Sequence, residues 1–353
     1  MKLEDAVAVE TRPLRTVKTH SSTRQFAIIG TGLVLLTAGL VMSTALGAVT
    51  IGLNEVLAAL FGEAERVPRQ IVWNLRVPRA LVGALVGMNL AVAGALLQGI
   101  MRNPMAAPTI VGVTAGAGLA AAAVIILLPG VAALLPPIAF LGALAASVFV
   151  YVLSWQPGIG TSPVRMVLAG VAVTTMLGAF TTGLMTVFSD RIQSVVLWMA
   201  GNLVGTSWNH LELIWFYSVI GVVGGLLLVR QLNVMQLGDE TAQSLGVRVE
   251  RARFLAMGLA ALLAASAVSV AGLVGFVGLI VPHVMRLLGG HNHGYLVPAS
   301  AVGGAALIVW ADLGARMVLA PLELPVGVVT ALIGGPFFVF LLYRARFVGG
   351  RNL

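Results

Sequence analysis

The chain has 353 residues, of which 59% are hydrophobic and only 10% are charged, and it contains no cysteine. Soluble domains carry roughly a quarter charged residues, so the composition excludes an ordinary water-soluble protein. The missing cysteine excludes disulfides, thiol catalysis and cysteine-ligated metals. The net charge of +8 comes from Lys and Arg scattered through short polar segments, so we expect an integral membrane protein with no nucleic-acid partner.

The first 25 residues form a polar tail that holds five of the 21 basic residues. A signal peptide cleaved near Ala45-Leu46-Gly47 is one interpretation of the apolar run that follows. That run, 26–50, is longer than the hydrophobic region of about 7–15 residues in a signal peptide, and many more apolar runs come after it. A cytoplasmic tail at 1–25 and a first membrane span are therefore expected.

Ten apolar runs follow one another along the chain. A transmembrane helix needs about 20 predominantly apolar residues, and the 42 glycines suit helices that pack closely in lipid. We expect an all-α membrane protein, with one domain of about ten spans over 26–353. The predicted spans are 26–48, 78–101, 109–128, 132–153, 165–188, 209–229, 254–271, 273–289, 295–315 and 326–343.

The basic residues orient these spans. If the N-terminus is cytoplasmic, the cytoplasmic segments carry 15 Lys and Arg and the opposite side carries six. Because cytoplasmic loops are enriched in Lys and Arg, both termini and the polar segment 230–253 are predicted to lie in the cytoplasm.

The segment "QGIMRNPMAAP" (98–108) ends the second predicted span. Pro104 cannot continue a helix and disfavours helical backbone at Asn103, so a simple turn explains part of the motif. Gln98, Asn103 and Met105 lie together at one helix end, where polar groups are expected to line a cavity mouth rather than face lipid.

Two spans have arginines beside the ends that are predicted to face away from the cytoplasm. These arginines lie in "NLRVPRALVG" (74–83) and "WADLGARMVLAPLELPVG" (310–327). Docking of a partner would need these guanidiniums to project outward and meet carboxylates. Two structural alternatives are snorkelling of Arg76 and Arg79 at the membrane surface and an i,i+4 ion pair between Asp312 and Arg316. Between them, 189–208 is predicted to form a short amphipathic helix at the surface.

His283 lies near the end of the eighth span, and His291 and His293 follow that span. No carboxylate or cysteine completes a metal-ligand set, so no metal site is expected. No GxxxxGK[ST] nucleotide motif occurs, and no carboxylate pair lies deep in a predicted span as an ion relay would require. Uphill transport would then draw its energy from a partner. A secondary transporter driven by an ion gradient is the alternative of a different class.

The chain resembles the FecCD family, the permeases of type II ATP-binding-cassette importers for iron siderophores and cobalamin. The resemblance covers about residues 26–345. It is carried by these segments: "RVPRALVGALVGMNLAVAGALLQGIMRNPMAAPTIVGVTAGAG", "VLAGVAV", "WMAGNLVGTSW", "LGDETAQSLGV", "GLVGFVGLIVPHVMRLLGG", "LVPASAVGGAALIVWADLGAR" and "ELPVGVVTALIGGPFFVFLL".

The resemblance implies roles for three groups of residues. A helix near 236–250 is expected to couple to the ATPase, and its glycine brackets and acidic first turn agree with a short helix. Arginines at the outer ends of spans would dock a binding protein, and two loops would form a cytoplasmic gate. The coupling residues are Gly238, Asp239, Glu240, Ala242, Leu245 and Gly246; the docking residues are Arg76, Arg79 and Arg316; the gate residues are Asn103, Met105, Thr161 and Ser162.

The resemblance further implies the partners. They are a second permease subunit, identical or paralogous, two cytoplasmic ATPase subunits that hold ATP and magnesium, and a periplasmic or lipid-anchored binding protein. This chain itself would bind no cofactor and catalyse no reaction. We expect a permease in the bacterial cytoplasmic membrane that imports an iron chelate, a ferric siderophore above all, with heme, cobalamin or molybdate as the alternatives.

Overall fold

The computed structural model of the protein describes residues 21–47, 52–61 and 69–349. This part is almost entirely helical, and a short antiparallel hairpin is formed by β1 (Trp155–Gln156) and β2 (Gly160–Thr161). The helices are α1 (Ser22–Ala45), α2 (Leu53–Phe61), η1 (Gln70–Arg76), α4 (Val77–Met101), η2 (Pro108–Val111), α5 (Val113–Leu127), η3 (Pro129–Leu134), α6 (Leu135–Ser154), α7 (Pro163–Val187), η4 (Ser189–Arg191), α8 (Ile192–Met199), α9 (Trp208–Leu227), α10 (Val229–Met235), α11 (Asp239–Ser244), α12 (Val249–Ala271), α13 (Val277–Gly289), α14 (His293–Met317) and α15 (Val326–Gly349).

The ten predicted spans each fall on one apolar helix. Within the described residues, seven helical segments are long and apolar enough to cross a membrane alone, and three shorter apolar helices occur at Val113–Leu127, Val277–Gly289 and Val326–Leu341. The all-α membrane fold is confirmed. The predicted tail 1–25 lies largely outside the described residues, and α1 already begins at Ser22, capped by the Ser21 side chain.

The predicted start of the eighth span differs from the structure for a reason of backbone geometry. The eighth span was expected from residue 273, but α13 begins only at Val277. Gly272 and Phe276 both have a φ of 67°, a left-handed conformation that interrupts a right-handed helix. The segment 189–208 forms the short helices η4 and α8 instead of a span, which agrees with the prediction of a short helix there.

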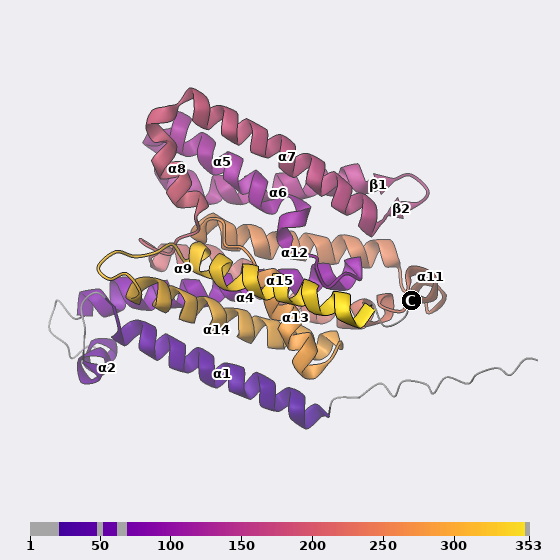
Figure 1. The fold of residues 1–353 in the computed structure, drawn as a ribbon, viewed down its shortest axis with the longest axis horizontal. Helices are drawn as coiled ribbons and strands as arrows, with labels where there is room; N and C mark the ends of the chain where they lie inside the picture. Colours follow the sequence, from indigo (N-terminus) through magenta and orange to yellow (C-terminus); the bar gives the residue numbers. More distant parts are fainter. Residues whose placement is uncertain (1–20, 48–51, 62–68, 350–353) are drawn as a thin grey trace, which may run out of the picture.

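Helix α4 is the centre of the bundle and packs against α14, α12, α13 and α9. In Figure 1, α1 lies along one edge and the group α5 to α8 along the other. Small residues allow the close contacts with α4: a methyl group at Gly87 would overlap the carbonyl oxygen of Gly304 in α14, and one at Gly94 would overlap that of Gly278 in α13. The backbones therefore meet directly at these crossings.

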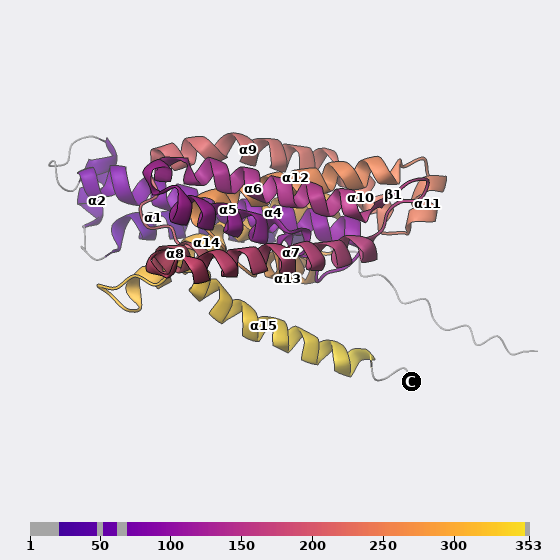
Figure 2. The ribbon, with the colours of Figure 1, turned by 90° about the horizontal axis from the view of Figure 1, so that it is seen from above.

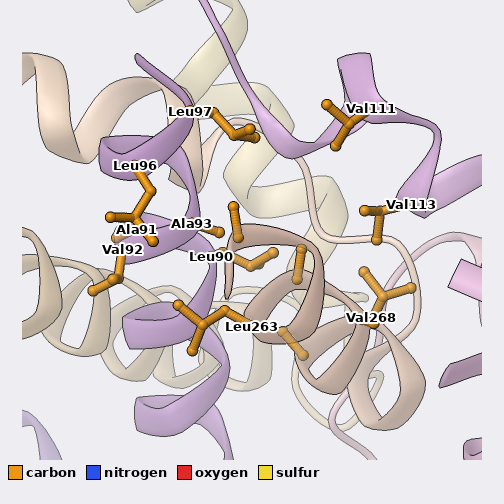
Figure 3. Packing of buried hydrophobic residues seen from close by; sticks show 14 of the residues in the cluster. Leu90, Ala91, Val92, Ala93, Leu96, Leu97, Val111, Val113, Leu263 and Val268 are labelled. Atoms are coloured by element: carbon orange, nitrogen blue, oxygen red, sulfur yellow. The ribbon is translucent and has the colours of Figure 1, made fainter. Parts of the chain in front are cut away.

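The core next to α4 is built from aliphatic side chains. Figure 3 shows Leu90, Leu96 and Leu97 of α4 with Val113 of α5 and Leu263 of α12. All five are at most 4% exposed. This packing fixes the position of α12, whose first turns carry the polar residues described below.

The two ends of the bundle hold different parts of the chain. Helix α11 and the β1–β2 hairpin lie at one end, together with the first turn of α1 and the last turn of α15 (Figure 1). Helices α2 and α8 lie at the other end. The start of α1 and the end of α15 thus lie at the same end of the bundle, as an even number of spans requires.

Helix α15 is attached to the bundle at its beginning. The Gly327 N–H donates a hydrogen bond to the Gly201 carbonyl at 3.1 Å, and the neighbouring Asn202 N–H donates to the Ala271 carbonyl at 2.8 Å. Three separate segments are joined there by backbone hydrogen bonds. From this point α15 diverges from the bundle, as Figure 2 shows.

Candidate functional site

The predicted coupling segment folds into the short helix α11. Gly238 precedes it with a φ of 110° and Gly246 follows it with a φ of 81°, which are conformations that favour glycine. The expected helix between two glycines is confirmed. Ala242 is fully buried against the bundle, and its carbonyl accepts a hydrogen bond from the Val247 N–H at 2.9 Å.

Most of the other side chains of α11 are exposed. Asp239 and Glu240 occupy its first turn, where carboxylates are favourable near the helix N-terminus. Glu240 is exposed, and Leu245 at the C-cap is 59% exposed. The helix thus offers an exposed surface while Ala242 holds it in place.

A buried arginine ties α11 to the membrane helices. Arg253 of α12 is 1% exposed. Its Nη2 lies 2.9 Å from an Asp239 carboxylate oxygen, and its Nη1 lies 3.0 Å from Glu250 and 2.8 Å from the Thr161 carbonyl. One guanidinium therefore joins α11, the first turn of α12 and the β1–β2 hairpin.

The predicted spans placed Arg253 in the polar segment 230–253, and this placement is wrong. The reason is the start of α12, which was predicted at 254 but lies at Val249. Arg253 is consequently one turn inside the helix, where a charged side chain needs a partner. The i,i+3 spacing from Glu250 was the available signal for that partner.

The predicted gate residue Thr161 belongs to the same cluster. Its backbone N–H and its hydroxyl donate to Glu250 at 2.9 and 3.0 Å. A methyl group at Gly160 would collide with this carboxylate, so the hairpin packs tightly on α12. Ser162 follows as the N-cap of α7 and accepts a hydrogen bond from the Arg165 N–H at 3.2 Å.

The other predicted gate residues lie in the loop after α4. Arg102 has a φ of 49°, and the Asn103 side chain accepts a hydrogen bond from the Met105 N–H at 2.9 Å. This turn ends α4 before Pro104. The Arg102 guanidinium lies 3.8 Å from Asp239. Asp239 therefore contacts the loop after α4 directly and reaches the hairpin through Arg253.

A cavity of about 220 Å³ adjoins this loop, and Gln98, Asn103 and Arg286 are among its lining residues. Arg286 donates to the Gln98 amide oxygen at 2.8 Å. Gln98 and Asn103 thus line a cavity as expected, whereas Met105, which was expected beside them, is not among its lining residues. His291 also lines this cavity, and within the described residues no three His, Cys, Asp or Glu side chains gather as a metal site would require.

The three predicted docking arginines lie at the opposite end, and they are turned inward. Arg76 is 6% exposed and donates to the Thr44 and Ala45 carbonyls at 3.0 and 2.8 Å. Arg316 is 5% exposed and donates to the Ser43 hydroxyl at 2.6 Å. Both guanidiniums hold the end of α1.

Arg79 makes the remaining contacts at this end. It donates to both carboxylate oxygens of Asp312 and lies 2.8 Å from Glu323. Arg316 lies 3.2 Å from the same Asp312, so the i,i+4 ion pair considered from the sequence is present. The expected outward projection of these guanidiniums is wrong for this structure, because their partners come from the chain itself.

Comparison with known proteins agrees with these features. Residues 35–344 match the model of the FecCD transport family, so the chain belongs to the FecCD transport family. It is a multi-pass membrane permease and a transport subunit rather than an enzyme, with ATP hydrolysis in a separate subunit.

Three relatives are named as permeases for three different compounds. The iron(3+)-hydroxamate permease FhuB of Bacillus subtilis is 40% identical over 89% of this chain and 82% of its own length. The cobalamin permease BtuC of Halobacterium salinarum is 45% identical over 77% and 73%. The hemin permease HmuU of Yersinia pestis is 41% identical over 78% and 84%.

A solved structure has the same fold. It is described as an inward-facing conformation of a metal-chelate type ABC transporter, and it is 29% identical with a TM-score of 0.80, covering 90% of this chain and 99% of its own.

Proposed function

We propose that the protein is the permease of an ATP-driven importer that carries a ferric siderophore across the bacterial cytoplasmic membrane. It would pair with a second permease subunit, identical or paralogous. Two ATPase subunits with ATP and magnesium would bind at the α11 end, and a binding protein would deliver the chelate at the α8 end. Both termini would lie in the cytoplasm, as the excess of Lys and Arg at that side supports.

The observation that carries this mechanism is the set of contacts around Asp239. Helix α11 is exposed, and Asp239 connects it to Arg253 and Arg102. Arg253 in turn holds the Thr161 hairpin. A movement of α11 imposed by an ATPase would therefore reach both predicted gate loops through direct contacts rather than through the bundle as a whole.

The gate assignments follow from this placement. Asn103, Met105, Thr161 and Ser162 lie in the two loops that Asp239 contacts directly or through Arg253. We propose that these loops close the cytoplasmic side of the path when α11 is in one position. They would open it when α11 moves.

The proposal for Arg76, Arg79 and Arg316 is that they contribute the positive charge that attracts a binding protein. Arg79 is the best candidate for direct contact, because its partner Glu323 is the more exposed of its two carboxylates. An acidic residue of the binding protein would replace Glu323 at Arg79. Arg76 and Arg316 would then act mainly by holding α1.

The substrate is the finer part of the proposal. An iron-hydroxamate permease matches most of this chain, which supports a ferric siderophore, whereas the hemin and cobalamin permeases mark the alternatives of the same class. In every case the path needs to be wide and to bind weakly, because the binding protein supplies the selectivity.

Reconstitution tests the proposal. The protein, its ATPase and its binding protein are placed in proteoliposomes and offered ferric hydroxamate, ferric citrate, heme and cobalamin. ATP-dependent uptake of a ferric siderophore is the expected result. Preferred uptake of heme or cobalamin would change the substrate only, whereas uptake driven by a proton or sodium gradient without any ATPase would replace the importer with a secondary transporter.

A further inference from the structure

A pocket lined by three arginines lies beside α11, between the end of α9 and the start of α12. It is a pocket of about 430 Å³ lined by Arg230 of α10, Arg248 at the N-cap of α12 and Arg251 in the first turn of α12. All three arginines are exposed. Leu228 and Leu255 add an apolar wall.

These arginines differ from the other basic residues near α11. Arg102 and Arg253 both contact Asp239, and Arg165 donates to the Gly160 carbonyl. Across the described residues, by contrast, no ion pair is formed by the three arginines of the pocket. The neighbouring carboxylates of Asp239 and Glu250 are paired with Arg253 instead.

The pocket lies between the ends of two helices that are long and apolar enough to cross a membrane. The span on α9 ends at Leu227 and the span on α12 begins at Val249. Exposed apolar side chains continue from the pocket along both helices, with Leu227 on α9 and Phe254 and Leu255 on α12. A molecule in the pocket would therefore have charged contacts at one end and apolar contacts at the other.

We propose that this pocket binds the phosphate headgroup of an anionic phospholipid, whose acyl chains lie along α9 and α12. Guanidinium groups bind phosphate oxygens bidentately, and basic pockets between spans suit anionic headgroups. Gln231 also lines the pocket, and its buried amide oxygen accepts no hydrogen bond from the described residues. A hydroxyl of a glycerol headgroup would supply the missing donor.

An acidic surface of a partner protein is the competing occupant, since Leu245 and Gly246 of the coupling segment also line the pocket. The lipid is favoured because Phe254 and Leu255 of α12 are exposed beside the pocket. An acidic protein surface would leave these two apolar side chains to be covered separately. The lipid site requires neither the direction nor the substrate of transport, although it borders the surface proposed for the ATPase.

Native mass spectrometry of the full-length protein in a delipidating detergent tests the site. The probes are dioleoylphosphatidylglycerol, dioleoylphosphatidylcholine and inorganic phosphate. One variant carries Arg230→Gln, Arg248→Gln and Arg251→Gln together, and a second carries Lys at the same three positions to keep the charge. Arg69→Gln is the control, because Arg69 is exposed and precedes η1, which leads into the start of α4, away from α11.

We expect the wild-type protein to bind the phosphatidylglycerol more tightly than the phosphatidylcholine. Affinity for the anionic lipid should fall roughly fivefold for each arginine lost, as one charge near an anionic lipid contributes about that much. The Lys variant should retain most of the preference, and Arg69→Gln should retain all of it.

Three results would overturn the proposal. One is an unchanged preference for phosphatidylglycerol in the Gln variant. Another is displacement of the lipid by inorganic phosphate at equal concentration, which would indicate a site for free phosphate. The third is a Gln variant that keeps the lipid but no longer copurifies with the ATPase subunit, which would assign the arginines to a protein contact.

Discussion

The Arg253 guanidinium in α12 lies 2.9 Å from the Asp239 carboxylate in α11. This contact joins a short exposed helix to a membrane span whose arginine is buried. Because Arg253 also holds Glu250 and the Thr161 carbonyl, displacement of α11 would disturb the hairpin as well. The pair is where we expect a mechanical signal to enter the bundle.

The change Asp239→Asn tests this link. Asn keeps the size of the side chain but removes its charge, so the charge-assisted hydrogen bond to Arg253 is weakened. Such a bond is worth about 1.5–3 kcal/mol, and we expect ATP-dependent uptake to fall by roughly tenfold or more. The measurement is uptake and ATP hydrolysis in the same proteoliposomes, where hydrolysis should continue.

The matched control is Glu240→Gln, on the next residue of α11. Glu240 is exposed and forms no ion pair within the part of the chain that the structure describes. Equal loss of uptake in both variants would mean that α11 responds to its net charge, and the role of the Asp239–Arg253 pair would be lost.

Asn103 supports the other predicted gate loop through its side-chain oxygen. Asn103→Ala removes the acceptor for the Met105 N–H, so we expect the loop to loosen and chelate to leak from loaded proteoliposomes. Asn103→Asp keeps an acceptor in the same place and should leak much less. Wild-type retention of chelate by the Ala variant would remove Asn103 from the gate.

Glu323 offers a test of docking that leaves the buried arginines in place. Glu323→Gln removes one carboxylate from Arg79 but keeps Asp312. If Arg79 meets the binding protein, its guanidinium, now less neutralised, should bind an incoming carboxylate better, and docking should tighten at low salt, where charge pairs are least screened. Unchanged affinity across salt concentrations would leave Arg79 with its structural role alone.

The close packing of α4 predicts a strong effect of one methyl group. Gly87→Ala places a carbon against the Gly304 carbonyl. We expect the free energy of unfolding in detergent to fall by about 1–3 kcal/mol, as for other overpacked cores. Gly258→Ala in α12 meets no atom within 4 Å and should stabilise its helix by about 0.5–1 kcal/mol. A similar melting shift for both variants would contradict the direct contact of backbones.

The spans were predictable because hydrophobic length is a local property of the sequence. The ten predicted ranges coincide with apolar helices, and the glycines around "DETAQSL" correctly bracket α11. The late start of α13 was less accessible, since a positive φ at Phe276 depends on tertiary packing rather than on residue type.

The partners of charged residues were the hardest feature to predict. The pair Asp312–Arg316 was visible as an i,i+4 spacing, but Arg79 meets Asp312 and Glu323 from a distant part of the chain. Arg253 and Thr161 are similarly remote in sequence. Only the fold brings such residues together, so their direction of projection was misjudged for all three outer arginines.

The hydrogen bond from Gly327 to Gly201 holds the start of α15, which can serve as a pivot if the contact of Gly334 with Phe276 is released. The helix has 24 residues, which corresponds to a length of about 36 Å at 1.5 Å per residue. A tilt of about 10° around the pivot would therefore carry the far end about 6 Å, roughly one helical turn. A small rearrangement near Gly201 at the α8 end can thus appear as a large displacement at the α11 end, without any bending of the helix itself.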